Sequence, residues 1–380
     1  VCRLNKSIYG LRQASRQWFS KLTTTLVDAG YKQSLHDYSL LTFKSGSSFV
    51  AAVIYVDDIL LSGNDMSLIQ SVKTLLDKKF SIKDLGKIKY YLGLEVHRDN
   101  TGILLSQPKF VKDLLKSADM LDCKPLSVPL DPQVKLFDND MSGDLIPNAS
   151  VYRAWVGKLL YLTSSRPDIS FSVQLLSQFL HAPRVKHLQA AQRVLRYLKC
   201  TINHGLFFPA NNSLQLKGYS DSDWGGDPND RRSVGGYSFL LGPVAVSWRA
   251  KKQSVTSRST AEAEYRALAD ASCEVIWLKG LLNDLGLQIP GAVPLFCDNK
   301  SAIDLTANPV YHARTKHIEM DCHFIREKVQ SGLVTVTQIA SKDNYADILT
   351  KGLGRVLHWS CCHQLGLRFP PSTLKDPENI

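Results

Sequence analysis

One succession of predicted elements constrains the fold of this chain more than any other feature. From Leu214 onward, three strand-like runs precede a long helical run over residues 259–286, and then come one strand, two helical segments, another strand and a last helix. Alternating apolar and polar residues mark the strands, whereas apolar residues three or four positions apart mark the helices. This order predicts an α/β domain with five strands, which we place at residues 213–355.

The first block, residues 1–105, also mixes helices and strands. A helical pattern covers residues 16–28, and another covers residues 67–80. Between them, two apolar runs flank the acidic step Asp57-Asp58. Two apolar strands joined by so short a step predict a tight hairpin.

The second block, residues 106–212, is mostly helical. Residues 131–149 are rich in Pro, Asp, Asn and Ser, which predicts a loop. An amphipathic helix is predicted at residues 187–199, and its polar face is either solvated or in contact with phosphates. The apolar face of that helix carries Leu188, Ala191, Leu195 and Leu198, and the polar face carries Arg193, Arg196 and Lys199. Residues 356–380 form a tail with little pattern.

Composition excludes some classes of protein. Of 380 residues, 44% are hydrophobic and 21% charged, so the chain is globular and not disordered. Its longest apolar run, residues 49–56, is too short to span a membrane, so we expect no membrane association. A net charge of +11 permits a polyanionic partner. The chain begins with Val1 and not Met, which predicts that it is a piece of something longer.

The cysteines and histidines argue against zinc. The eight cysteines are scattered and none forms a CxxC pair, which favours free thiols in a reducing compartment. Three histidines lie close in sequence: His312, His317 and His323. In a helix His317 and His323 would lie on different faces, and His317 is better placed to pair with Asp321. We therefore expect no structural zinc.

Four acidic residues in the last domain lie where strands end or helices begin. Asp221 ends the first strand, Asp298 ends the strand at 293–298, and Asp347 lies in the first turn of the last helix. Taken singly, a strand-end Asp is usually a turn former, and Asp347 could simply favour the helix dipole. Taken together in this order of elements, they indicate a shared site.

Periodicity selects the fourth acid from the long helix. Glu264 aligns with Leu268, Ala271 and Val275 on the apolar face, which should pack on the sheet. Glu262 aligns with Arg266, so we expect it to face solvent or bound nucleic acid. Carboxylates buried side by side are costly unless cations neutralise them. Two Mg²⁺ ions (or Mn²⁺) prefer such oxygen ligands and together can promote an in-line displacement at phosphorus.

This last domain resembles the ribonuclease H domain of copia-type LTR retrotransposons. The matching strings are GYSDSDWGGD, DRRSVGGY, VSWRAKKQSVTSRSTAEAEYRAL, CDNKSAI, RTKHIEMDCHFIRE and NYADILTK. The resemblance implies an RNase-H-like fold with a mixed five-stranded sheet. It also implies that Asp221, Glu264, Asp298 and Asp347 are catalytic metal ligands. Asp223 has the same strand phase as Asp221, and only the family pattern separates the two.

The preceding residues resemble the palm, thumb and connection of the reverse transcriptase of the same elements. The matching strings include SIYGLRQASRQWFSKL, YVDD at residues 55–58, LGKIKYYLGLEV and HLQAAQRVLRYLKCTINHGL. The resemblance implies that Asp57 and Asp58 bind catalytic metals and that Arg12 and Gln13 contact template and nucleotide. The family usually has Pro at the position of Ser15. Its third catalytic Asp lies upstream of these strings, so we expect this chain not to polymerise DNA.

We therefore expect a retrotransposon reverse transcriptase/ribonuclease H, with RNA–DNA hybrid and primer–template as partners and an intracellular location, in virus-like particles or the nucleus. Basic residues would contact phosphates without reading sequence. These are Arg231, Arg232, Arg249, Lys251, Lys252 and Arg258. Two alternatives stay open: a non-catalytic relic that only binds nucleic acid, and an integrase or transposase. An integrase would place its Glu on a later helix.

Overall fold

The structure is a computed structural model that describes residues 10–307 and 319–369. The described residues fall into two compact units. Unit 1 contains those up to Lys87 together with residues 276–290, and unit 2 contains the rest. The boundaries expected at residues 105, 212 and 355 remain predictions. His312 and His317, considered above for zinc, lie outside the described residues.

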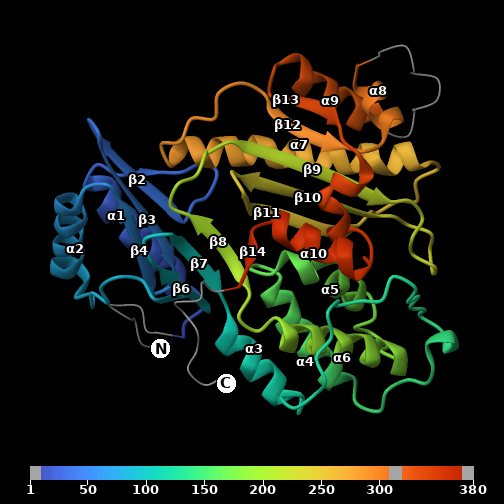
Figure 1. The fold of residues 1–380 in the computed structure, drawn as a ribbon. Helices are drawn as coiled ribbons and strands as arrows, with labels where there is room; N and C mark the ends of the chain where they lie inside the picture. Colours follow the sequence, from blue (N-terminus) through green and yellow to red (C-terminus); the bar gives the residue numbers. More distant parts are fainter. Residues whose placement is uncertain (1–9, 308–318, 370–380) are drawn as a thin grey trace, which may run out of the picture. The chain divides into compact units, whose positions relative to one another are not determined.

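Unit 1 is a four-stranded antiparallel sheet with two helices, in the sheet order β1-β2-β3-β4 (Figure 1). Its elements are α1 (Ala14–Asp28), β1 (Lys32–Gln33), β2 (Leu40–Ser45), β3 (Ser48–Tyr55), β4 (Asp58–Gly63) and α2 (Met66–Phe80). The predicted hairpin is confirmed, with Tyr55 paired to Asp58 across the turn. Apolar side chains of both helices and of β2 and β3 form one core, in which Leu22, Leu26 and Leu76 have no exposed surface.

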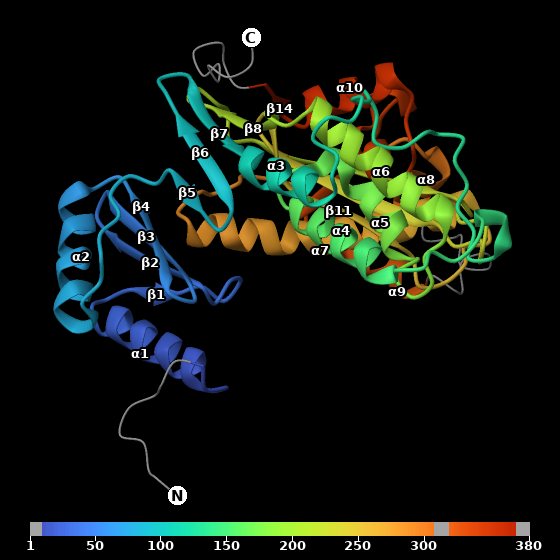
Figure 2. The same ribbon diagram turned by 90° about the horizontal axis from the view of Figure 1, so that it is seen from below.

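Unit 2 begins with an antiparallel sheet in the order β14-β8-β7-β6-β5. Its strands are β5 (Tyr90–Tyr91), β6 (Leu94–Arg98), β7 (Gly102–Ser106), β8 (Gly205–Pro209) and β14 (Leu367–Arg368). Between β7 and β8 lie α3 (Pro108–Ser117), α4 (Ala149–Leu162), the 3-10 turn η2 (Pro167–Ile169), α5 (Ser170–Ser177) and α6 (Val185–Cys200). Figure 2 shows α4, α5 and α6 side by side, around one apolar core. On α6, Ala191, Leu195 and Leu198 are fully buried, as the amphipathic pattern predicts.

The second sheet of unit 2 is mixed, in the order β11-β10-β9-β12-β13 (Figure 1). Strands β9 to β11 are antiparallel neighbours, whereas β9, β12 and β13 run parallel. The elements are β9 (Leu216–Asp223), β10 (Val234–Leu241), β11 (Val244–Lys252), α7 (Thr260–Asp284), β12 (Val293–Cys297), α8 (Lys300–Ala307), α9 (Glu319–Gln330) and β13 (Val334–Gln338). The last part of α7, from residue 276 onward, belongs to unit 1. The predicted order of elements and the mixed five-stranded sheet are confirmed. The last helix is a short 3-10 helix instead, η6 (Tyr345–Leu349).

The C-terminal segment is more ordered than its sequence pattern suggests. Residues 355–364 form helix α10 (Arg355–Gln364), and β14 then pairs with β8. The buried positions of α10 are His358, Cys361 and Cys362. Because this buried set holds no Leu, Ile or Val, the apolar periodicity that marks other helices is absent here.

A buried polar network joins α10 to the helices of unit 2. Arg166 donates two hydrogen bonds to Asp168, at 2.9 and 2.7 Å, and both residues are almost fully buried. Tyr197 also donates to Asp168, at 2.5 Å, and the ring nitrogen Nε2 of His358 lies 3.0 Å from the Tyr197 hydroxyl. Burial lowers the pKa of His358 to about 4, so this imidazole is neutral at pH 7. Asp168, His358 and Cys362 are close enough to share a metal, but Arg166 already neutralises the carboxylate.

None of the helices in the described part of the chain combines the length and the apolar character that a membrane crossing requires.

Candidate active site

Four acids expected to share a site are carried by four separate elements. Asp221 is on β9, Glu264 on the first turns of α7, Asp298 directly after β12, and Asp347 on η6. The pairing of Tyr219 with Phe296 in the parallel β9–β12 ladder, extended by two residues, brings Asp221 beside Asp298. Carboxylate oxygens of Asp221, Asp298 and Asp347 all lie within 4.8 Å of one another.

Burial and mutual repulsion dominate the electrostatics of this cluster. The exposed fractions are 1% for Asp221, 4% for Glu264 and 4% for Asp347. Burial, together with the charges of Asp221 and Asp298, raises the pKa of Glu264 to about 9. The pKa of Asp347 is raised to about 7, mainly by burial and secondly by the negative charge of Asp221. The protein alone therefore leaves this cluster short of positive charge.

Two residues that sequence reasoning missed also contact the cluster. The ammonium Nζ of Lys351 lies 3.1 Å from Asp347 Oδ1 and 3.4 Å from Asp221 Oδ2, and Thr350 donates its hydroxyl to Asp221 Oδ2. Although burial opposes it, Asp221 and Asp347 raise the pKa of Lys351, which stays charged. Both residues belong to the string NYADILTK, but neither has a sequence signal of its own. One ammonium does not balance four carboxylates.

The cluster fits hard divalent cations. Its donors are carboxylate oxygens, the ligands that Mg²⁺ and Mn²⁺ prefer. Asp347 Oδ1 is buried and accepts no hydrogen bond from the described residues, although Lys351 lies close by. The one ammonium near this oxygen is shared with Asp221, so the repulsion among the buried carboxylates is only partly compensated, and a bound cation would remove the remaining cost.

The structure separates the acids that the sequence left ambiguous. Glu264 lies on the buried face of α7, as its periodicity predicts. The prediction that Glu262 faces solvent or nucleic acid is wrong, because it is only 6% exposed. Glu262 accepts hydrogen bonds from the backbone N–H of Arg258, at 2.9 Å, and from the Arg266 guanidinium, at 3.0 Å. These bonds compensate its burial and fix the start of α7.

Asp223 differs from Asp221 in its partners. Its Oδ1 accepts a hydrogen bond of 2.6 Å from the backbone N–H of Val234 on the neighbouring strand β10. Burial above all raises the pKa of Asp223 to about 7. Asp221 instead meets Asp298 and Asp347. The geometry therefore favours Asp221 over Asp223 as a member of the site, in agreement with the family pattern.

The acids of the predicted polymerase site lie elsewhere, in unit 1. Asp57 and Asp58 are both exposed at the β3–β4 hairpin. Among the described residues, no third His, Cys, Asp or Glu comes close enough to complete a metal site with them. Arg12 and Gln13 are exposed just before α1. Within residues 10–307 and 319–369, this hairpin therefore lacks a complete set of metal ligands.

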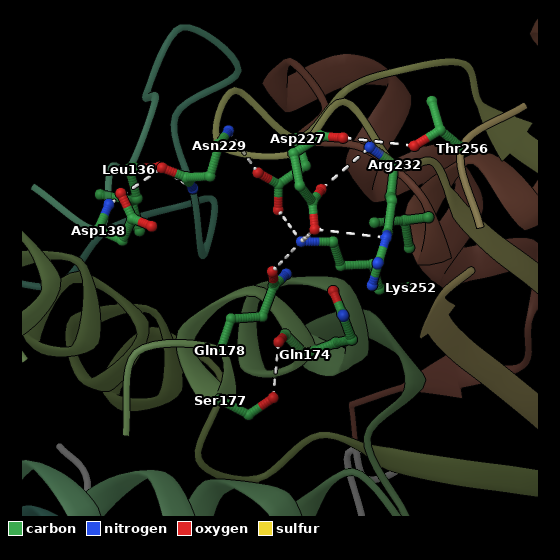
Figure 3. Close-up of polar contacts among 12 residues, drawn as sticks. Leu136, Asp138, Gln174, Ser177, Gln178, Asp227, Asn229, Arg232, Lys252 and Thr256 are labelled. Carbon is green, nitrogen blue, oxygen red and sulfur yellow. Dashed lines mark hydrogen bonds and ion pairs between the residues drawn. The ribbon is translucent and has the colours of Figure 1, made fainter. Parts of the chain in front are cut away.

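The expected phosphate-contacting residues fall into two groups. Arg231, Arg232, Lys251 and Arg258 are exposed, and Arg249 is half-buried, 3.7 Å from Asp270. Lys252 is engaged within the protein, as Figure 3 shows. Its ammonium lies 2.6 Å from Asp227, 2.9 Å from Asp230 and 2.9 Å from the amide oxygen of Gln178. Because its charge is already paired, Lys252 is a poorer candidate than the exposed residues for binding phosphate.

Comparisons with known proteins agree with this architecture. The family described as reverse transcriptase (RNA-dependent DNA polymerase) matches residues 1–132. The retrovirus-related Pol polyprotein from transposon RE1 of Arabidopsis thaliana is 44% identical over 98% of this chain. The retrovirus-related Pol polyprotein from transposon TNT 1-94 of Nicotiana tabacum is 39% identical over 97% of this chain. The chain spans 25% and 28% of the lengths of these two relatives.

A shorter relative is matched over most of its length. The putative transposon Ty5-1 protein of Saccharomyces cerevisiae is 32% identical over 72% of this chain and 90% of that protein. Among solved structures, RNase H1 from Halobacterium salinarum NRC-1 aligns with 36% of this chain and 94% of its own, with 18% identity and a TM-score of 0.27. A TM-score that low supports no conclusion, so the strand order carries the fold assignment.

The mixed sheet of unit 2 has the strand order of an RNase-H-like domain, and it follows a segment that matches a reverse-transcriptase family. The chain belongs to the family of retrovirus-related Pol polyproteins of copia-type transposons.

Proposed function

We propose that the acidic cluster of unit 2 cuts the RNA strand of RNA–DNA hybrids with the help of two Mg²⁺ ions. The convergence of four carboxylates from β9, α7, β12 and η6 carries this proposal. Three of them, Asp221, Glu264 and Asp347, are buried with too little positive charge around them. The order Asp, Glu, Asp, Asp, with Glu264 between Asp221 and Asp298, supports ribonuclease H over an integrase.

The chain's own residues would prepare the site. Asp221, Glu264, Asp298 and Asp347 would hold the metals, which when bound supply water activation and stabilise the leaving oxygen. Rigid strand ends orient Asp221 and Asp298, and the Thr350 hydroxyl fixes the rotamer of Asp221. Glu264 keeps its proton at pH 7 in the metal-free protein, since its pKa is about 9. Metal binding would therefore release a proton and strengthen as the pH rises.

Exposed basic residues would hold the substrate. Arg231, Arg232 and Arg258 can contact backbone phosphates of a hybrid without reading its sequence. Selection of RNA over DNA would then rest on contacts to the 2′-hydroxyl groups next to the scissile bond.

The decisive experiment is cleavage of an end-labelled RNA–DNA hybrid with Mg²⁺. We expect Asp298→Asn to lower the rate about 100-fold or more, because losing a metal ligand costs several kcal/mol of transition-state stabilisation. Asp304→Asn is the matched control, since Asp304 is an exposed aspartate on the neighbouring helix α8. Equal rates for the wild type and Asp298→Asn would refute the assignment. Hybrid binding without any cleavage would favour a non-catalytic relic.

We further propose that this chain by itself does not polymerise DNA. Asp57 and Asp58 are exposed, and no third carboxylate among the described residues joins them. Two carboxylates alone should hold metals poorly. Extension of a primed RNA template with Mg²⁺ and deoxynucleotides would contradict this proposal.

A further inference from the structure

Helix α5 carries a polar stripe with unsatisfied hydrogen-bonding groups. Ser170, Gln174 and Gln178 are four residues apart, so they share one face of the helix. Each has a buried atom without a hydrogen-bond partner: Oγ of Ser170, Oε1 of Gln174 and Nε2 of Gln178. Ser170 as a whole is only 6% exposed. Unsatisfied buried polar atoms cost free energy, so three on one stripe call for an explanation.

Two residues of this stripe, Ser170 and Gln174, line a cavity of about 550 Å³. One wall is formed by α4 and α5, and the other by β11, the edge strand of the mixed sheet. Figure 3 shows Gln174 and Gln178 on the same helix, with Gln178 pointing toward Lys252 of β11. The volume lies in the range of small-ligand sites. The lining residues that matter here are Ser170, Gln174, Ser177, Trp248 and Arg249.

The residues that line the cavity restrict the class of ligand that it could bind. No carboxylate is among the lining residues, so the cavity does not suit a metal ion. Arg249 is the charged residue of the described lining, and its ion-pair partner Asp270, 3.7 Å away, lies outside that lining. An anionic group of a ligand would therefore compete with Asp270 for Arg249. Trp248 donates its indole N–H to the backbone carbonyl of Thr163, at 2.8 Å, so its ring is held in place. An aromatic ring, a cation and free hydroxyl and amide groups are the features that bind unpaired nucleotides.

We propose that this cavity binds one unpaired base of a single-stranded nucleic acid. Gln174 Oε1 would accept a hydrogen bond from the base, and Ser170 Oγ would provide a second contact one helical turn away, about 5.4 Å along the axis. Arg249 would exchange its exposed partner Asp270 for the adjoining phosphate. None of these residues belongs to the acidic cluster, so this binding does not depend on cleavage.

The test measures fluorescence anisotropy of labelled hexanucleotides with the full chain, in EDTA so that no cleavage occurs. The probes are oligo-dA and an abasic hexamer with the same number of phosphates. We expect the wild type to prefer oligo-dA. We expect Gln174→Leu to weaken oligo-dA binding about tenfold and leave abasic binding unchanged.

Two further variants separate the possible causes. Gln189→Leu makes the same change at an exposed position of α6 and should bind like the wild type. Asp298→Asn should lose cleavage yet keep oligo-dA binding, so the two proposals can fail separately. If Gln174→Leu binds oligo-dA as tightly as the wild type, the proposal is overturned. A Gln174→Leu protein with a raised melting temperature and unchanged binding would identify a cavity filled by water only.

Discussion

The chain presents two sets of aspartates that its sequence marks as catalytic, and they differ in how the fold treats them. Asp57 and Asp58 lie side by side on one exposed hairpin turn, so local geometry alone brings them together. Asp221, Asp298 and Asp347 come from distant parts of the chain and meet near the ends of parallel strands. Bringing Asp57 and Asp58 together costs little free energy. The three buried aspartates repel one another away from water, so the rest of the domain must stabilise them.

The cost of the buried cluster is itself informative. A fold that buries repelling carboxylates without a balancing charge loses stability, and it regains that stability only when a cation binds. The exposed pair carries no such penalty, because water screens its charges. Burial with repulsion is therefore the property that separates a site prepared for metal from an acidic turn.

The largest effect is expected on cleavage activity, when a carboxylate of the buried cluster is compared with one of the exposed hairpin. Glu264→Gln should reduce hybrid cleavage about 100-fold or more, because it removes an anionic oxygen from the buried cluster. Asp57→Asn should leave cleavage unchanged. The cleavage rates of both variants are measured on the same labelled hybrid. A similar loss of rate in both variants would contradict the proposed difference between the two sites.

A smaller effect is expected when only the orientation of a ligand is changed. Thr350→Val keeps the shape of the side chain but removes the hydroxyl that donates to Asp221. We expect the Mg²⁺ concentration for half-maximal cleavage to rise about tenfold. Thr335→Val, at an exposed position of β13, serves as the control. An unchanged Mg²⁺ requirement would show that Thr350 has no role in positioning Asp221.

The electrostatic cost should also appear as a pH dependence of stability. The folded-state pKa of Glu264 is raised from 4.5 to about 9, so the folded protein holds a proton that the unfolded chain releases. In EDTA the melting temperature should therefore fall as the pH rises from about 4.5 to about 9. Mg²⁺ should reverse the fall, by about 1–2 °C for each 1 kcal/mol of repulsion removed. Glu264→Gln should show a flatter profile in EDTA, and an identical slope would argue against this origin.

The smallest effect is expected at the hairpin. Asp58→Asn should change the free energy of unfolding by no more than about 0.5 kcal/mol, since an exposed carboxylate has little to lose. Urea denaturation of the two proteins provides the measurement. A clear stabilisation on removing this charge would mean that Asp57 and Asp58 repel each other more strongly than exposed groups should.

Periodicity predicted those elements whose buried faces are apolar. The strands β9 to β13 and helices α6 and α7 follow such patterns, and Glu264 could be placed because it shares a face with Leu268. Helix α10 was missed because a histidine and two cysteines fill its buried positions. The burial of Glu262 and the pairing of Lys252 depend on particular polar partners. Glu262 accepts hydrogen bonds from Arg258 and Arg266, and Lys252 contacts Asp227, Asp230 and Gln178. Polar partners of this kind leave no apolar periodicity in the sequence.

The position of β14 has a consequence for synthesis of the protein. Leu367 and Arg368 complete a sheet whose other strands lie between residues 90 and 209, and α10 completes the buried network around Asp168. A ribosome making this chain will have released the earlier strands and helices long before these residues emerge. Until then the outer edge of β8 lacks its partner strand, and the Tyr197 hydroxyl lacks its contact with His358. Folding of unit 2 cannot finish until α10 and β14 have been translated, and ribosome-stalled chains ending before residue 355 should be more sensitive to protease than chains that include both elements.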